Sequence, residues 1–165
     1  MIQTQHMIQI DWNGPYKLPE LNQLTNTETD YGVYQIYGKH PVYGSNVLLY
    51  IGKADRQTFG IRISQEGWLY QNDANNLKIY IGRLHGNQPS SGSAWSSEID
   101  LAERLLLYVH KPAHNSKSIA SLVNQQLQYV HVLNWGHHRD LLPEVSGFRW
   151  TGRLDEEGYE VYRWE

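Results

Sequence analysis

Two short runs rich in Tyr, Val and Ile lie near the middle of the chain and predict a pair of β-strands. The runs are GVYQIY at 32–37 and NVLLYIG at 46–52, and the polar segment between them contains Gly and Pro, as turns do. The pattern therefore predicts an antiparallel hairpin. Because paired strands bring residues from distant positions to about 5 Å on one face, we expect Tyr34 and Tyr50 to share a surface.

The spacing of apolar residues divides the following region into two helices and a third strand. Residues 57–66 have an irregular helical pattern, whereas LKIYIGRL at 77–84 alternates with the period of a strand. The polar segment 85–95 predicts a flexible loop. SSEIDLAERLLLYVHK at 96–111 carries the strongest helix pattern, with serines that can cap its start and Pro112 to end it.

Glu103 lies at the edge of the apolar stripe of the helix predicted at 96–111. At helical spacing its side chain falls about 40° from Ile99 and about 60° from Leu106, so it is not on the solvated side. We therefore expect this carboxylate to be partly desolvated. Two interpretations fit such a residue: a surface carboxylate paired with Lys or Arg, or an acid kept for a functional site.

The C-terminal region has weaker patterns. Residues 118–127 predict a further helix, YVHVLNWG at 129–136 fits either a strand or a helix end, and 148–165 predict a hairpin that turns at DEEG. The whole chain of 165 residues, 40 % of them apolar, fits a single domain spanning 1–165. We therefore expect an α/β (α+β) domain, with 118–165 as a C-terminal helix and hairpin extension.

Composition changes this picture only slightly. Cysteine is absent, which excludes disulfides and cysteine-based zinc sites. Residues 1–14 lack a basic stretch followed by an apolar core, and no run approaches the roughly 18 apolar residues of a membrane span. We expect a soluble cytoplasmic protein without a membrane partner.

Charge is unevenly distributed along the chain. The net charge is -3, but residues 32–117 hold nine Lys and Arg against six Asp and Glu, whereas residues 1–31 and 118–165 are each at -3. A modestly basic centre between acidic flanks is compatible with phosphate contact in the centre. Nucleic acid is therefore a partner to consider despite the acidic total.

Five features follow one another in an order that resembles the GIY-YIG nuclease superfamily. They are GVY at 32–34, YIG at 50–52, Arg62 in a helix, Glu103 in a later helix, and PAHN ending at Asn115. The resemblance covers residues 30–117. It implies a nuclease core there, with a small central antiparallel β-sheet flanked by helices and elaborated at both ends of the chain.

The resemblance also implies catalytic roles. Tyr34 would be the general base and Tyr50 its support, Arg62 would bind the phosphate, and Glu103 would be the single carboxylate that binds Mg²⁺ or Mn²⁺. Gly32 and Val33 complete the first motif, with Val in place of Ile.

Three further residues are implied on the substrate side. Gly52 ends the second motif, Lys53 follows it where some members carry a phosphate-facing or tyrosine-tuning lysine, and Asn115 takes the place of the late structural or phosphate-side asparagine. Together these residues predict an endonuclease with DNA as its most favoured partner, either alone or as a homodimer that cuts both strands. Duplex, branched or single-stranded DNA and RNA all stay open as substrates.

Phosphodiester hydrolysis accounts for these residue types. The reaction needs an activated water and neutralisation of the charge that grows on the phosphate oxygens. Mg²⁺ keeps most of its waters and needs only one or two carboxylates, which suits Glu103. A tyrosine with an ordinary pKa of about 10 is a poor base, so we expect Lys53, Arg62 and the metal to lower the pKa of Tyr34.

One residue departs from the pattern of the superfamily, and two other functions are therefore considered. Glu66 stands one helical turn after Arg62, where the superfamily carries His or Tyr, and a carboxylate there would repel phosphate. A catalytically weak or inactive nucleic-acid-binding module is therefore the alternative, and a structural protein whose triplets reflect strand composition is a third hypothesis. A zinc site at His110 and His114 is opposed by Pro112, which breaks the helix that would align them.

Overall fold

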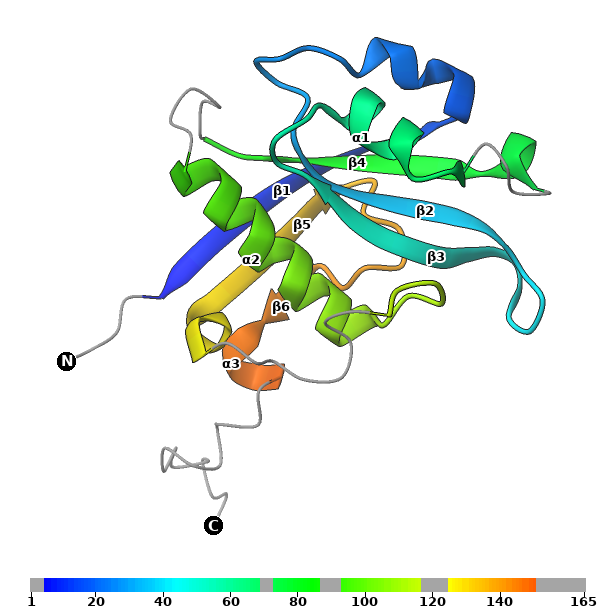
Figure 1. Cartoon of the computed structure of the whole chain (residues 1–165). Coiled ribbons are helices and arrows are strands. Elements are labelled where there is room, and N and C mark those ends of the chain that lie inside the picture. The colour runs from blue at the N-terminus through cyan, green and yellow to red at the C-terminus, as the bar shows by residue number, and fades with distance from the viewer. Residues whose placement is uncertain (1–4, 69–72, 87–92, 117–124, 151–165) are drawn as a thin grey trace.

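The computed structural model describes residues 5–68, 73–86, 93–116 and 125–150, which form a curled six-stranded sheet with helices on both faces (Figure 1). The strands stand in the order β3-β2-β4-β1-β5-β6. Their bounds are β1 His6–Tyr16, β2 Gly32–His40, β3 Gly44–Ala54, β4 Lys78–Leu84, β5 Val130–Gly136 and β6 Glu144–Ser146. The helices are α1 Phe59–Gln65, α2 Ser93–His110 and α3 Gly147–Trp150, with 3₁₀ turns at Leu18–Gln23 (η1), Ala74–Asn76 (η3) and Gln125–Tyr129 (η5).

The predicted hairpin, third strand and two helices of the central region are confirmed. β2 and β3 pair antiparallel, and β4 pairs antiparallel with the other side of β2. α1 falls within the range predicted for it, and α2 ends at His110, directly before Lys111 and Pro112. The local patterns of apolar residues were therefore sufficient to predict these elements.

The sheet is mixed, so the prediction of an antiparallel sheet is wrong in one part. β1 occupies an inner position, antiparallel to β4 but parallel to β5 along His6–Trp12. The alternation of buried Ile8, Ile10 and Trp12 with more exposed residues is the strand signal in this segment. β5 resolves the ambiguous segment 129–136 as a strand.

Two further predictions for element bounds need correction. α2 begins at Ser93, so the last part of the loop predicted at 85–95 is helical. Phe148 lies in α3 and not in the first strand of a C-terminal hairpin, while the rest of that predicted hairpin, 151–165, lies outside the described residues. The helix predicted at 118–127 also lies mostly outside them, and its last residues belong to η5.

Apolar side chains cover both faces of the sheet. α2 packs Ile99, Leu105 and neighbouring residues against one face, in a cluster that includes Val33 and Ile51. α1 and η1 pack against the other face, in a cluster that includes Tyr34. Because successive strand residues point to opposite faces, the edge strand β3 presents alternate residues to α1 and to α2. None of the described helices is long and apolar enough to cross a membrane.

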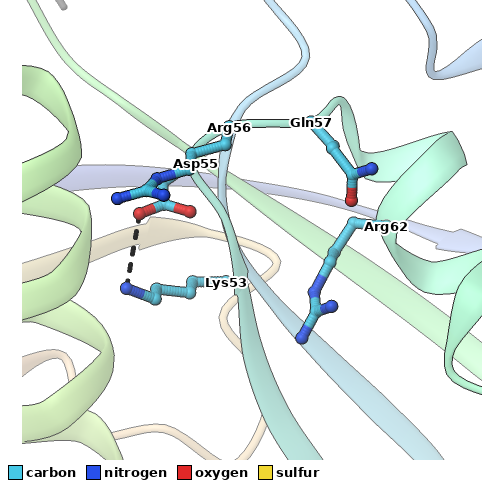
Figure 2. Close-up of a pocket in the computed structure, with 5 residues that line it drawn as sticks. All are labelled: Lys53, Asp55, Arg56, Gln57 and Arg62. Atoms are coloured by element: carbon cyan, nitrogen blue, oxygen red, sulfur yellow. Dashed lines mark hydrogen bonds and ion pairs between the residues drawn. The ribbon is translucent and has the colours of Figure 1, made fainter.

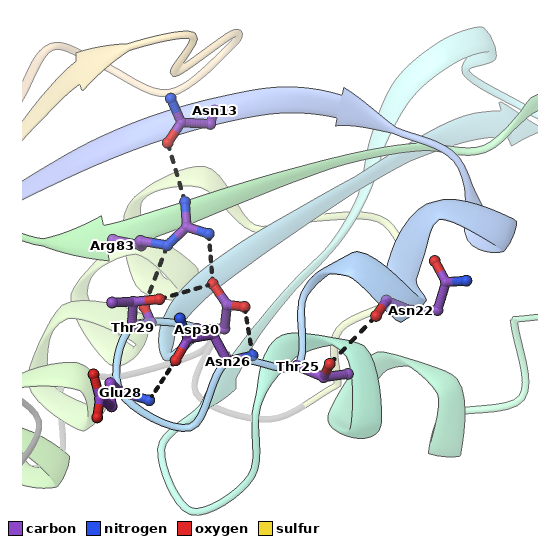
Figure 3. A network of polar contacts seen from close by, with 8 residues as sticks. All are labelled: Asn13, Asn22, Thr25, Asn26, Glu28, Thr29, Asp30 and Arg83. Carbon is purple, nitrogen blue, oxygen red and sulfur yellow. Dashed lines mark hydrogen bonds and ion pairs between the residues drawn. The ribbon is translucent and has the colours of Figure 1, made fainter.

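A polar network fixes the start of β2 and α1 (Figure 3). The buried carboxylate of Asp30 forms an ion pair with Arg83 of β4 at 2.6 Å and accepts a hydrogen bond from the backbone N–H of Asn26. The backbone carbonyl of Asp30 accepts a hydrogen bond from the N–H of Phe59. Arg83 also donates to Asn13 of β1. The network thus ties the loop before β2 to the sheet and to the first residue of α1.

Candidate active site at the edge of β3

The catalytic residues predicted from the sequence come from four elements that meet around the edge of β3. Tyr34 lies on β2, Tyr50 on β3, Arg62 on α1 and Glu103 on α2. The rings of Tyr34 and Tyr50 are 6.1 Å apart between centroids, and the charge of Glu103 acts on both Tyr50 and Arg62. The fold therefore brings these four side chains into one region, although they lie far apart in the sequence.

Gly52 allows the two tyrosine rings to lie close together. It pairs with Tyr34 across the hairpin, and a Cβ atom added to Gly52 would lie 2.5 Å from the Tyr34 ring and 2.6 Å from the Tyr50 ring. Any larger residue would push the tyrosines apart. The packing of the two rings is by itself a physical reason for glycine at the end of the second motif, and it does not require Gly52 to contact a substrate.

The protein's own charges do not lower the pKa of Tyr34 or Tyr50; the expected lowering also included a bound metal. Burial, followed by the nearby charge of Glu66, raises the pKa of Tyr34 far above its ordinary value. The same causes, with Glu103 in addition, raise the pKa of Tyr50 to about 12. The hydroxyl of Tyr34 is buried and has no hydrogen bond of ordinary geometry among the described residues, although Arg62 and Glu66 lie near it. Tyr34 is therefore a neutral O–H group and a poor base.

Burial is the main reason why Arg62 does not bring these pKa values below their ordinary range, and Glu66 adds to it. The Arg62 guanidinium forms an ion pair with Glu66 at 2.9 Å, one helical turn away. The same carboxylate accepts a 3.4 Å hydrogen bond from Tyr50 and a 3.3 Å hydrogen bond from the indole of Trp68. Glu66 therefore neutralises the arginine that was predicted to bind phosphate, and it gathers the residues around that arginine.

Lys53 lies on the side of β3 that faces α2, where two carboxylates hold it. Its ammonium group is 2.7 Å from Asp100 and 3.3 Å from Asp55, and Asp55 also accepts from Ser96. Burial alone would lower the pKa of Lys53, but these partners raise it above its ordinary value. Asp55 and Asp100 were not predicted from the sequence. The three-residue spacing of Asp100 and Glu103 on one helix face was the available signal.

Glu103 differs from these acids because its carboxylate has no hydrogen bond or ion pair among the described residues. Burial raises the pKa of Glu103 to about 7, with Asp100 and Asp55 adding to the rise against the opposing charge of Lys53. A desolvated carboxylate without a partner costs stability. The prediction of a partly desolvated acid is confirmed, and no Lys or Arg of the described residues pairs with its carboxylate.

A cleft of about 360 Å³ opens at the end of β3 beside α1, and three of its five lining residues are cationic (Figure 2). The lining residues are Lys53, Asp55, Arg56, Gln57 and Arg62. Lys53 and Arg62 extend on opposite sides of the strand, and Arg56 is exposed. Arg56 was not predicted from the sequence; its place three residues after Lys53, directly after β3, was the available signal. The cleft has the charge and the open shape that an anionic chain requires.

Asn115 holds the backbone of β3. Its side-chain oxygen accepts from the N–H of Ile51 at 3.0 Å, and its amide donates to the carbonyl of Ile51 at 2.9 Å. The backbone N–H of His114 donates to the carbonyl of Leu49 on the same strand. The segment after α2 thus covers part of the free edge of β3, and Asn115 supports the strand that carries Tyr50.

His110, one of the two histidines considered for a zinc site, has both ring nitrogens engaged. Among the described residues no three His, Cys, Asp or Glu side chains gather closely enough to hold a metal ion. His110 uses one ring nitrogen toward the carbonyl of Leu106 and accepts with the other from the N–H of Leu142. Mg²⁺ needs only one or two protein carboxylates because it keeps several waters, so Glu103 alone is a suitable ligand for Mg²⁺.

Comparisons of the chain with protein-family models, curated proteins and solved structures find no match. The resemblance to the GIY-YIG superfamily therefore depends on the motifs of this chain alone.

Proposed function

We propose that the chain is a metal-dependent endonuclease that hydrolyses phosphodiester bonds in DNA. The observation that carries this proposal is the partly buried carboxylate of Glu103, which has no partner among the described residues and interacts electrostatically with Lys53 and Arg62 of the cleft. An acid kept only for stability would have a partner, because an unpaired buried charge is costly. A role in binding a cation or substrate accounts for that cost.

The side chains around the cleft have suitable chemistry for the remaining tasks. Arg62 offers a planar fork that matches two phosphate oxygens, and Lys53 and Arg56 add positive charge. Tyr50 is half-buried and donates to Glu66, so its O–H can donate to a phosphate oxygen or a water instead. The raised pKa of Tyr34 favours the role of a neutral donor over the base that the resemblance implied.

Glu103 is the residue that would hold the cation, Mg²⁺ or Mn²⁺. Asp55 and Asp100 are already engaged by Lys53, and Mg²⁺ requires few protein carboxylates because it keeps several waters. When bound, such a cation would neutralise charge at the phosphate and lower the pKa of a bound water.

The function is tested by cleavage of supercoiled plasmid, single-stranded DNA, branched DNA and RNA with Mg²⁺ or Mn²⁺ and with EDTA. We expect metal-dependent cutting of DNA by the wild-type protein. Arg62→Ala should lower the initial rate by about 10- to 100-fold, because a hydrogen bond to a charged group is worth about 1.5–3 kcal/mol.

The matched control is Lys78→Ala, which removes one exposed cation from β4. Its rate should stay within about twofold of wild type, since it leaves the cleft unchanged. Cutting that persists in EDTA, or an Arg62→Ala rate equal to that of Lys78→Ala, would contradict the proposal.

The alternative function, a nucleic-acid-binding module with weak or no cleavage, is favoured by the Arg62–Glu66 ion pair. Glu66→Gln should raise DNA affinity by about tenfold, or about 1.4 kcal/mol, because the amide removes a like charge that faces the ligand. The measurement is fluorescence anisotropy of labelled DNA in EDTA, followed by the cleavage rate with Mg²⁺.

Glu144→Gln, an exposed acid of β6, is the control for the change in net charge. Equal gains in the two variants would show a general charge effect and contradict a specific role for Glu66. Cleavage that is absent from wild type and present in Glu66→Gln would identify Glu66 as the residue that separates the two functions.

A further inference from the structure

A row of aromatic rings leads from the tip of the β2–β3 hairpin to the candidate site. Neighbouring ring centroids are 4.7, 5.6, 6.1, 5.6 and 6.1 Å apart along the row. In order from the tip, the rings belong to Tyr43, His40, His114, Trp68, Tyr50 and Tyr34. The row joins residues of the hairpin, of the segment after α2 and of the turn after α1.

The outer end of the row is open to solvent, whereas its inner end is buried. Tyr43 is 68 % exposed and stacks on His40 at an angle of 26° between ring planes. His114 is exposed and stacks almost parallel on Trp68, at 8°. Trp68 and Tyr34 are buried. Core packing accounts for the inner rings, but it does not account for an exposed ring that extends the stack into solvent.

The row also ends where the cations begin. Tyr50, its fifth ring, donates to Glu66, and Glu66 pairs with Arg62 of the cleft. A polymer that combines flat rings with regularly spaced phosphates would match both parts. Nucleobases stack on aromatic side chains when they are unpaired, and each such contact is worth about 1–3 kcal/mol.

We propose that the exposed rings of this row, Tyr43 and His114, stack with the unpaired bases of a single-stranded DNA segment and direct its backbone to the cleft beside Arg62. The proposal rests on the proposed nuclease function for what happens at the cleft, and it names the substrate class as single-stranded or containing unpaired nucleotides. Duplex DNA presents its bases already stacked and cannot use the row.

The test is fluorescence anisotropy of the full chain with a labelled 12-nucleotide single strand, the matching duplex and the matching RNA strand, in EDTA. We expect the single strand of DNA to bind more tightly than the duplex. Tyr43→Leu combined with His114→Leu should weaken single-strand binding by about tenfold or more, because the leucines keep apolar bulk but offer no ring for stacking. Duplex binding should not change.

Two controls separate stacking from folding and from general hydrophobicity. Tyr43→Trp keeps an aromatic face and should retain single-strand affinity. Trp135→Leu removes an exposed ring from β5, outside the row, and should leave the affinity unchanged. Equal affinities for single strand and duplex, or an unchanged affinity in the Tyr43/His114 variant, would overturn the proposal, and tighter binding of the RNA strand would overturn its commitment to DNA.

Failure of this inference can be distinguished from failure of the proposed function. If metal-dependent cutting occurs and the double leucine variant binds normally, the nuclease proposal stands and the row has no role in binding. If nothing is cut but single-strand binding depends on Tyr43 and His114, the row binds DNA on a protein that does not cleave it.

Discussion

Replacing Glu103 by glutamine is expected to slow DNA cleavage by about 10³-fold, within the range for the loss of a residue that handles a proton or a cation. Glutamine has nearly the same shape, so the cleft should keep its form. The same change is expected to stabilise the folded protein above pH 7, by on the order of 2 to 3 kcal/mol. Loss of activity with a gain in stability is typical of a residue kept for function.

The sign of the stability change follows from the raised pKa. Burial raises the pKa of Glu103 from its ordinary 4.5 to about 7. Below the ordinary value the residue is neutral in both the folded and the unfolded chain. As the pH rises toward 7 the unfolded chain ionises first, so the folded state progressively loses stability relative to it. The full penalty is present above pH 7, and Glu103→Gln removes it.

The measurements are urea unfolding at pH 5 and pH 8 and cleavage rates between those values. At limiting Mg²⁺ the wild-type rate should rise with pH up to about 7 and then level off, because only the ionised carboxylate binds a cation. Glu144→Gln should show the wild-type rate and no gain in stability. A Glu103→Gln variant that cuts normally, or that is less stable at pH 8, would contradict the role given to this residue.

Local sequence patterns predicted the parts of the site that depend on a few neighbouring residues. The hairpin that brings Tyr34 beside Tyr50 follows from two strand patterns and a turn, and the place of Glu103 at the rim of α2 follows from helical spacing. The inner position of β1 could not be predicted in this way. Its parallel partner β5 lies more than 100 residues away, and the alternation of apolar residues within a segment predicts a strand without specifying its partner.

The pKa values and ion pairs of the site also could not be predicted from the sequence. Arg62 was expected to lower the pKa of the tyrosines, but its charge is taken up by Glu66, and the burial of Tyr34 dominates. Likewise Lys53 is held by Asp55 and Asp100, which come from different elements. A pKa depends on burial and on all neighbouring charges together, so the list of residues alone gives neither its size nor its direction.

Asp30→Ala is expected to destabilise the protein by about 2–3 kcal/mol, because it removes the charge-assisted hydrogen bonds that this buried carboxylate accepts. Asp30 is 3 % exposed, and its two carboxylate oxygens accept from Arg83 and from the N–H of Asn26 (Figure 3). The loss should extend to the site, since the backbone of Asp30 holds the first residue of α1 and Arg62 lies on the next turn.

Urea unfolding of Asp30→Ala, Arg83→Ala and the double variant measures this coupling. The double variant should cost less than the sum of the single changes, because it removes both charges together. Arg104→Ala is the matched control: it breaks the exposed ion pair with Asp100 on α2 and should cost at most about 1 kcal/mol. If Asp30→Ala cost no more than Arg104→Ala, the network of Figure 3 could not be what fixes α1, and the placement of Arg62 would have to depend on the apolar packing of Phe59 and Ile63 instead.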